Sequence, residues 1–108
     1  MLKYTLKVSG TKHRIVTAEF EDETYAPLSS FLLSEVRNFG SIIVAKISSV
    51  LRHEAEQADF NGNIYSLTIT PETTTLTDNF AEYNNTSTEL TIRTEELLEL
   101  IQFIMHNS

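Results

Sequence analysis

The spacing of the apolar residues alternates between two periods along the chain, and the order of these periods limits the folds open to it. In residues 2–8 every second residue is apolar, which is the period of a strand with one buried face. Residues 13–20 form a second run that is rich in β-branched side chains. Gly10 lies in the polar segment between the runs, where it can take a positive φ. These features predict an N-terminal hairpin.

The spacing becomes helical after residue 26. Pro27 suits the first turn of a helix, where its missing N–H costs nothing, and Gly40 stands where a C-terminal cap is expected. The apolar positions of the first segment lie three or four residues apart: Leu28, Phe31, Leu32, Val36 and Phe39. Residues 43–51 continue this spacing. We expect two helices here, with a short strand over the β-branched residues 42–44 as the alternative.

The period of two returns in the second half of the chain. Asn61-Gly62-Asn63 predicts a turn, and residues 65–69, 73–80 and 89–93 are expected strands. Thr94 is the expected N-cap of a C-terminal helix, because a threonine hydroxyl can accept a backbone hydrogen bond there. The acids that follow it suit the positive end of the helix dipole.

The expected order is therefore strand, strand, helix, helix, strand, strand, strand, helix (ββααβββα). Short turns between consecutive strands require antiparallel pairing, and helices bury their apolar stripes against a sheet. We expect a single α+β domain over residues 1–108. Its core is a single antiparallel sheet of about five strands with helices packed on one face.

The net charge of −7 is concentrated in one part of the chain. Residues 53–92 contain seven acids and no Lys or Arg, whereas residues 1–52 carry a small positive charge. A surface of this kind repels nucleic acid and anionic membranes and attracts basic partners. Improved solubility is the alternative explanation of the acidity.

The sequence also predicts where the protein acts. The N-terminal residues lack the continuous apolar core of a signal peptide. No stretch reaches the roughly 18 apolar residues that a membrane helix needs. The chain has no cysteine, which fits a reducing compartment. We expect a cytoplasmic protein with no membrane contact.

The sequence contains few residue patterns that are typical of catalytic or ligand-binding sites. The three glycines are too far apart for a phosphate-binding loop, and no serine lies in a Gly-x-Ser-x-Gly motif. His53 and Glu56 share a face if residues 52–59 are helical, a spacing that can hold a metal ion. His13 or His106 would then have to complete the site, and a solvated helix end is the simpler interpretation. We expect no enzymatic activity and no catalytic, cofactor-binding or metal-binding residues.

Nucleic-acid binding is not expected either. Four basic residues can gather on the N-terminal hairpin: Lys3, Lys7, Lys12 and Arg14. So small a patch is weak against the overall negative charge.

Two features favour a protein-binding role. An edge strand of the threonine-rich central hairpin can accept a strand from a partner, and the surrounding acids can steer a basic protein toward it. The candidate partner-binding residues are the acids of residues 53–92: Glu54, Glu56, Asp59, Glu72, Asp78, Glu82 and Glu89.

The second half of the chain resembles a known family. Its order is Phe-Asn-Gly-Asn-Ile-Tyr-Ser-Leu-Thr-Ile at residues 60–69, then a threonine-rich hairpin, then Thr-Glu-Glu-Leu-Leu-Glu-Leu-Ile at residues 94–101. This layout is similar to that of small bacterial immunity proteins of polymorphic-toxin systems, including contact-dependent growth inhibition systems. The resemblance implies a cytoplasmic protein that binds a cognate toxin domain, often a basic nuclease, and blocks it. It transfers no individual binding residues.

The sequence thus predicts a non-enzymatic acidic binding protein that neutralises a basic toxin domain by occluding its surface. The alternative is a small structural or regulatory module that self-associates, for example as a homodimer, through its broad C-terminal helix.

Overall fold

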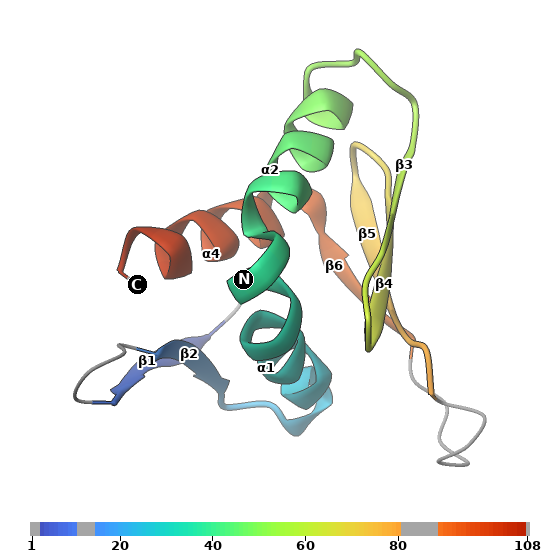
Figure 1. Cartoon of the computed structure of the whole chain (residues 1–108). Coiled ribbons are helices and arrows are strands. Elements are labelled where there is room, and N and C mark those ends of the chain that lie inside the picture. The colour runs from blue at the N-terminus through green and yellow to red at the C-terminus, as the bar shows by residue number, and fades with distance from the viewer. Residues whose placement is uncertain (1–2, 11–14, 81–88, 108) are drawn as a thin grey trace.

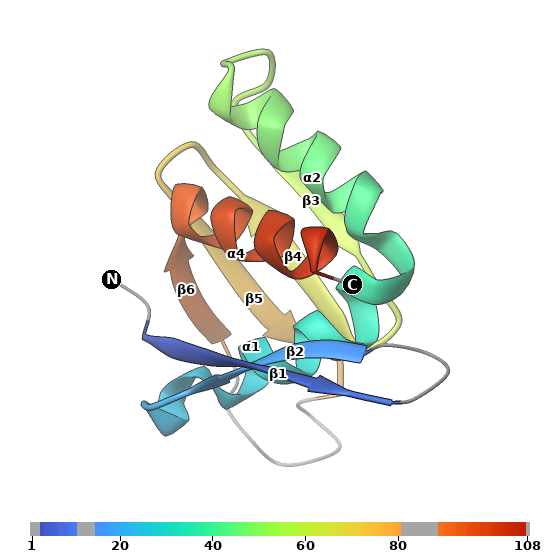
Figure 2. The same ribbon diagram turned by 90° about the vertical axis from the view of Figure 1, so that its left-hand side faces the viewer.

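Helices cover one face of a four-stranded sheet, and a two-stranded hairpin packs against these helices from the other side (Figure 1, Figure 2). The computed structural model describes residues 3–10, 15–80 and 89–107. The α+β class predicted from the sequence is confirmed. Within the described residues, no helix has both the length and the apolar character needed to cross a membrane.

The N-terminal hairpin forms as predicted. Strands β1 (Tyr4–Ser9) and β2 (Ile15–Phe20) pair antiparallel with Val8 opposite Val16. Gly10 has the expected positive φ, at 95°, and residues 11–14 of the predicted turn and second strand lie outside the described residues. The hairpin is tied to the helices, because the Ser29 hydroxyl donates a hydrogen bond to the carbonyl of Ala18 at 2.6 Å.

The expectation of a single five-stranded sheet is wrong. The described strands form two sheets, β1-β2 and β3-β4-β5-β6. Strand β2 buries Val16 and Ala18 against the helices, so side-chain packing, and not a shared ladder of hydrogen bonds, joins the hairpin to the rest of the molecule. Alternating periodicity identifies a strand, but it does not tell which other strand its edges will meet.

The helical segment is continuous where the sequence predicts two helices. A short 3₁₀ turn (η1, Glu23–Tyr25) leads into α1 (Ala26–Phe31), a π-helical turn (η2, Leu32–Val36) and α2 (Arg37–Leu51). Pro27 lies in the first turn of α1, as predicted. The strand alternative for residues 42–44 is not adopted, since these residues are helical.

Gly40 does not end a helix. It lies buried inside α2, where a Cβ atom would come within 2.8 Å of the Met105 sulfur on the C-terminal helix. The glycine therefore serves the close approach of two helices, a role that its position in the sequence does not distinguish from a cap.

The larger sheet has a strand that the sequence analysis did not predict. Strand β3 (Ala58–Asn61) pairs with β4 (Tyr65–Ile69), which pairs with β5 (Thr73–Asp78), which pairs with β6 (Glu89–Arg93), all antiparallel. The turn predicted over residues 61–63 overlaps the link between β3 and β4, which is residues 62–64. The inner face of the sheet contributes seven buried apolar side chains to the core: Phe60, Tyr65, Leu67, Ile69, Leu76, Leu90 and Ile92. The helices contribute the facing ones: Leu28, Phe31, Leu32, Val36, Ile43, Ile47, Val50, Leu97, Leu100, Ile101 and Ile104.

Thr94 is not the N-cap of the C-terminal helix α4 (Thr94–His106); the cap is Arg93. Thr94 is the first helical residue, and it is fully buried. Its hydroxyl donates to the carbonyl of Thr70 at 2.6 Å and lies 2.8 Å from the buried hydroxyl of Thr74. The threonine thus joins the helix to the β4–β5 turn instead of capping the helix.

Replacing Thr94 by valine is expected to lower the free energy of unfolding by about 1–3 kcal/mol, because the Thr74 hydroxyl is left buried without its partner. Chemical denaturation followed by circular dichroism measures the change. Thr91→Val, on the exposed side of β6, is the matched control and should leave stability almost unchanged. Equal unfolding midpoints for the two variants would contradict the bridging role of Thr94.

Candidate functional site

The described members of the candidate partner-binding set are spread over both ends and both edges of the larger sheet. Glu54 and Glu56 lie in the link between α2 and β3, and Glu72 lies in the β4–β5 turn. Because Ala58 at the start of β3 is opposite Ile69 at the end of β4, these three acids lie at the same end of the sheet. Glu54 forms an exposed ion pair with Arg52 at 3.0 Å, which offsets part of its charge.

Three of the remaining acids lie within the strands themselves. Asp59 and Glu89 are exposed on β3 and β6, the two edge strands. Asp78 is half-buried, and its carboxylate accepts a hydrogen bond from the backbone N–H of Phe80 at 2.8 Å. Glu82 lies outside the described residues. Among the described acids of the set, only Asp59 and Glu89 share one face of the sheet, and they lie on its opposite edge strands.

The face of the larger sheet that is turned away from the helices (Figure 1) is rich in hydroxyl side chains. Two rows of side chains cross it in register: Asp59, Thr68, Thr75 and Thr91, then Asn61, Ser66, Thr77 and Glu89. Among the described strand residues, Arg93 is the only base on this face. Short hydroxyl side chains lose little rotamer freedom when they are covered, so the face is suited to contact with another protein.

The segment considered for a metal ion or a proton relay is not helical. Helix α2 ends at Leu51, and His53 has a left-handed φ of 60°. His53 and Glu56 therefore do not share a helical face, and that part of the sequence analysis is wrong. His106 ends α4, and His13 lies outside the described residues. The described residues contain no group of three side chains of the kind that hold a metal ion.

The basic patch considered for nucleic acid is only partly described. Lys3 and Lys7 are exposed at β1, where Lys7 pairs with Glu19 at 2.7 Å. Lys12 and Arg14 lie outside the described residues.

A buried carboxylate that the sequence analysis missed holds the β3–β4 turn. Glu35, in the π-helical turn η2, is fully buried. Its Oε2 accepts the backbone N–H of Asn63 at 3.0 Å, and its Oε1 accepts that of Ile64 at 3.2 Å. Within the described part of the chain, no basic side chain pairs with it. The available sequence signal was an acid on the apolar stripe, between Leu32 and Phe39.

The space beside the carboxylate is filled by the turn itself. A Cβ atom on Gly62 would overlap the Glu35 carboxylate and would come within 2.6 Å of the carbonyl oxygen of Tyr65. Since the φ of Gly62 is not positive, the turn requires glycine for lack of space and not for its backbone conformation.

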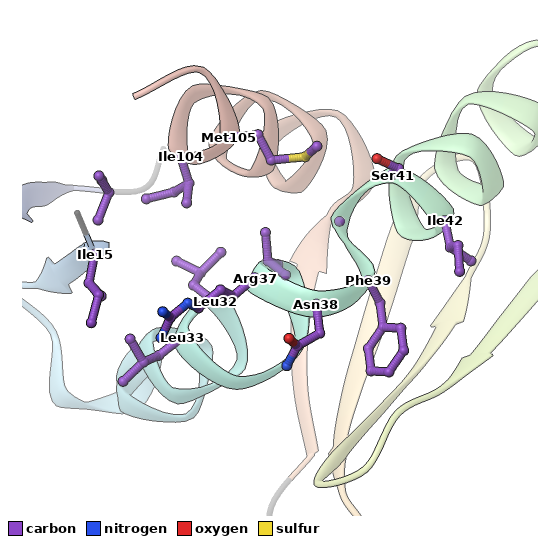
Figure 3. Close-up of a pocket in the computed structure, with 13 residues that line it drawn as sticks. Ile15, Leu32, Leu33, Arg37, Asn38, Phe39, Ser41, Ile42, Ile104 and Met105 are labelled. Carbon is purple, nitrogen blue, oxygen red and sulfur yellow. The ribbon is translucent and has the colours of Figure 1, made fainter. Parts of the chain in front are cut away.

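An apolar groove lies on the opposite side of the helical layer, between β2, the start of α2 and the end of α4 (Figure 3). Its volume is about 510 Å³. Leu33, Ile42 and Met105 line it and remain at least 38% exposed, and Arg37 is the one charged residue among the described residues that line it. None of the described acids of the candidate partner-binding set lines this groove, so these acids and the groove are separate features.

Comparison with known proteins finds one informative relative. A protein named "Immunity protein" from Bacillus cereus is 40% identical to this chain over 74 residues. The match covers 68% of this chain and 62% of the relative, so the chain spans about three-fifths of that protein's length. The relative's name agrees with the family that the sequence resembles. No family model matches the chain, and no solved structure matches it.

Proposed function

We propose that this chain is an immunity protein that binds a cognate toxin in the cytoplasm and neutralises it without catalysis. The observation that carries the proposal is the 40% identity to a protein named as an immunity protein. The hydroxyl-rich outer face of the larger sheet supports the proposal, because this face offers a broad contact area on the side of the sheet opposite the core.

We further propose that the toxin is a basic nuclease domain and that the chain occludes its surface. The support is electrostatic: residues 53–92 carry seven acids and no base, and the described members of this set surround the larger sheet. A nuclease that holds nucleic acid needs a basic surface. Complementary charge speeds the encounter of two such surfaces and fixes their orientation.

The neighbouring gene provides the direct test. The toxin domain encoded immediately upstream should arrest growth when it is produced alone in a bacterial host, and co-production of this chain should restore growth. The two purified proteins should form a complex of nanomolar affinity. If no large toxin-like reading frame lies upstream, or if growth is not restored, the proposed function is wrong.

Charge reversal tests the acidic surface. Replacing Glu56 or Glu72 by lysine is expected to slow association with the toxin about 3–10-fold at low salt, because exposed charges act mainly on the association rate. Glu54→Lys should have a smaller effect, since Arg52 already offsets this charge. Stopped-flow kinetics at several salt concentrations measures the rates.

Glu23→Lys is the matched control, because Glu23 is an exposed acid of η1 outside the base-free stretch. Association that is independent of salt and of all these reversals would exclude electrostatic steering by residues 53–92.

Self-association is the alternative, and the exposed apolar side chains around the groove favour it. Sedimentation velocity tests whether the chain self-associates. A monomer whose sedimentation does not change with concentration removes this alternative.

A further inference from the structure

Two exposed apolar residues lie at the end of the larger sheet opposite Glu72. Ile64 is 40% exposed and Phe80 is 45% exposed. The ladder between β4 and β5 ends at the pair Tyr65 and Asp78. The backbone N–H of Asn79 then donates to the carbonyl of Ile64 at 2.8 Å, which places Ile64 beside Asn79 and one residue from Phe80.

The backbone of Ile64 is fixed on both sides. Its N–H donates to Glu35, and its carbonyl accepts from Asn79. The rest of the turn is held as well, because the Gly62 N–H donates to the carbonyl of Tyr65 at 2.9 Å and the Asn79 amide donates to the carbonyl of Gly62 at 3.1 Å. The Ser66 hydroxyl in turn donates to the Asn79 side-chain oxygen at 2.8 Å. Each of these bonds restrains a turn that carries an exposed isoleucine.

Holding the turn in this way costs free energy that a turn with only a structural role does not need to spend. Burying a carboxylate without a basic partner is unfavourable, and an apolar side chain in the same place would avoid that desolvation. The structure uses instead a buried acid, a π-helical turn and a glycine that tolerates no Cβ atom. Irregular helical turns of this kind occur frequently at functional sites.

An exposed apolar side chain on a backbone that is held in place suits a binding surface. Residues that dominate binding energy are anchors near the centre of an interface, surrounded by groups that exclude water. An anchor that is already ordered loses less entropy when the partner binds. Two exposed asparagines in and beside this turn, Asn61 and Asn63, provide adaptable hydrogen bonds. Glu89, in the same row of the sheet as Asn61, adds negative charge.

We propose that Ile64 is the apolar anchor of the toxin interface, and that Glu35 is the positioning residue that holds the backbone of Ile64. The partner that fits is a protein surface with an apolar hollow bordered by basic side chains. This inference rests on the proposed function, since it locates the centre of the surface that the toxin covers.

Replacing Ile64 by aspartate tests the anchor against the upstream toxin domain. The affinity of the complex is expected to fall about 100-fold, as for a residue that dominates an interface. Ile42→Asp is the matched control, because Ile42 is 53% exposed on α2, beside the groove. This control should bind as the wild-type chain does. Thermal unfolding of both variants shows whether each remains folded.

Glu35→Gln tests the positioning role with a readout that a general loss of stability does not change. The amide keeps one carbonyl oxygen as an acceptor, so one of the two backbone hydrogen bonds is lost. Hydrogen exchange at the amides of Asn63 and Ile64 should accelerate, and the toxin should dissociate about 10-fold faster. Thr94→Val destabilises the fold away from this turn and should leave the dissociation rate unchanged.

The outcomes separate the inference from the proposed function. If the wild-type chain does not bind the toxin domain, the proposed function fails. If the wild-type chain binds and the folded Ile64→Asp variant binds equally well, the anchor is wrong although the function stands. A loss of binding with Ile42→Asp instead would place the interface at the groove and would also overturn the inference.

Discussion

Replacing Gly62 by alanine is expected to lower the free energy of unfolding by about 3–5 kcal/mol. The added Cβ atom overlaps the Glu35 carboxylate and lies 2.6 Å from the backbone carbonyl oxygen of Tyr65, which cannot move without disturbing β4. If the carboxylate moves away, the N–H groups of Asn63 and Ile64 lose their acceptor. Either response lowers the stability of the protein. Chemical denaturation measures the total change in the free energy of unfolding.

Gly40→Ala is the matched control for this prediction. There the new Cβ atom meets the sulfur of Met105 at 2.8 Å, near the end of a flexible side chain that can adopt another rotamer. Alanine also favours the helix by about 1 kcal/mol over glycine. The net change at residue 40 should be close to zero.

A double-mutant cycle identifies the cause at Gly62. Combining Gly62→Ala with Glu35→Ala removes the side chain that the Cβ atom overlaps, so the combined loss of stability should be clearly smaller than the sum of the two single losses. The contact with Tyr65 remains, and the rescue is therefore partial. Additive losses would show that Glu35 and Gly62 do not constrain each other.

Replacing Phe31 by alanine is expected to cost about 3–5 kcal/mol, because it leaves a cavity in a packed core. Phe31 ends α1 and is fully buried. Its ring packs edge-on against Tyr65 of β4, with the ring centroids 6.4 Å apart. This contact connects the start of the helical layer to the sheet, and a domain with about 5–15 kcal/mol of total stability tolerates its loss poorly.

Leu33, two residues further along, provides the comparison. It is 46% exposed at the rim of the groove, so Leu33→Ala should change the free energy of unfolding by less than about 1 kcal/mol. Thermal unfolding of the two variants under the same conditions measures the contrast. Similar melting temperatures would mean that the core does not depend on the Phe31 contact.

The elements that the sequence predicted well are those whose pattern reflects local conformation. Alternation over residues 65–69 identified β4, and helical spacing from Leu28 to Val36 identified the buried face of the first helical segment. The Asn-Gly-Asn turn and the class of the fold followed from the same reasoning. In each case the side chains of one short segment carry the information, because one face of the segment must be buried.

The candidate site was predictable only in part. Composition located the acids in one part of the chain, but it did not show that they surround a sheet or that Arg52 pairs with Glu54. Glu35 appeared in the sequence as an acid on an apolar stripe. Its partners are 28 and 29 residues away, so no local pattern names them.

The apolar periods of the sequence by themselves determined the α+β class, with hairpins and amphipathic helices, because each period fixes which face of a local element must be buried. Only the tertiary structure decided that the strands divide into two sheets, that Thr94 bonds to Thr70 and Thr74 instead of capping its helix, and that Gly62 makes room for Glu35. These features depend on hydrogen bonds and close contacts between segments that are distant in the chain. Such contacts form only when the whole core assembles.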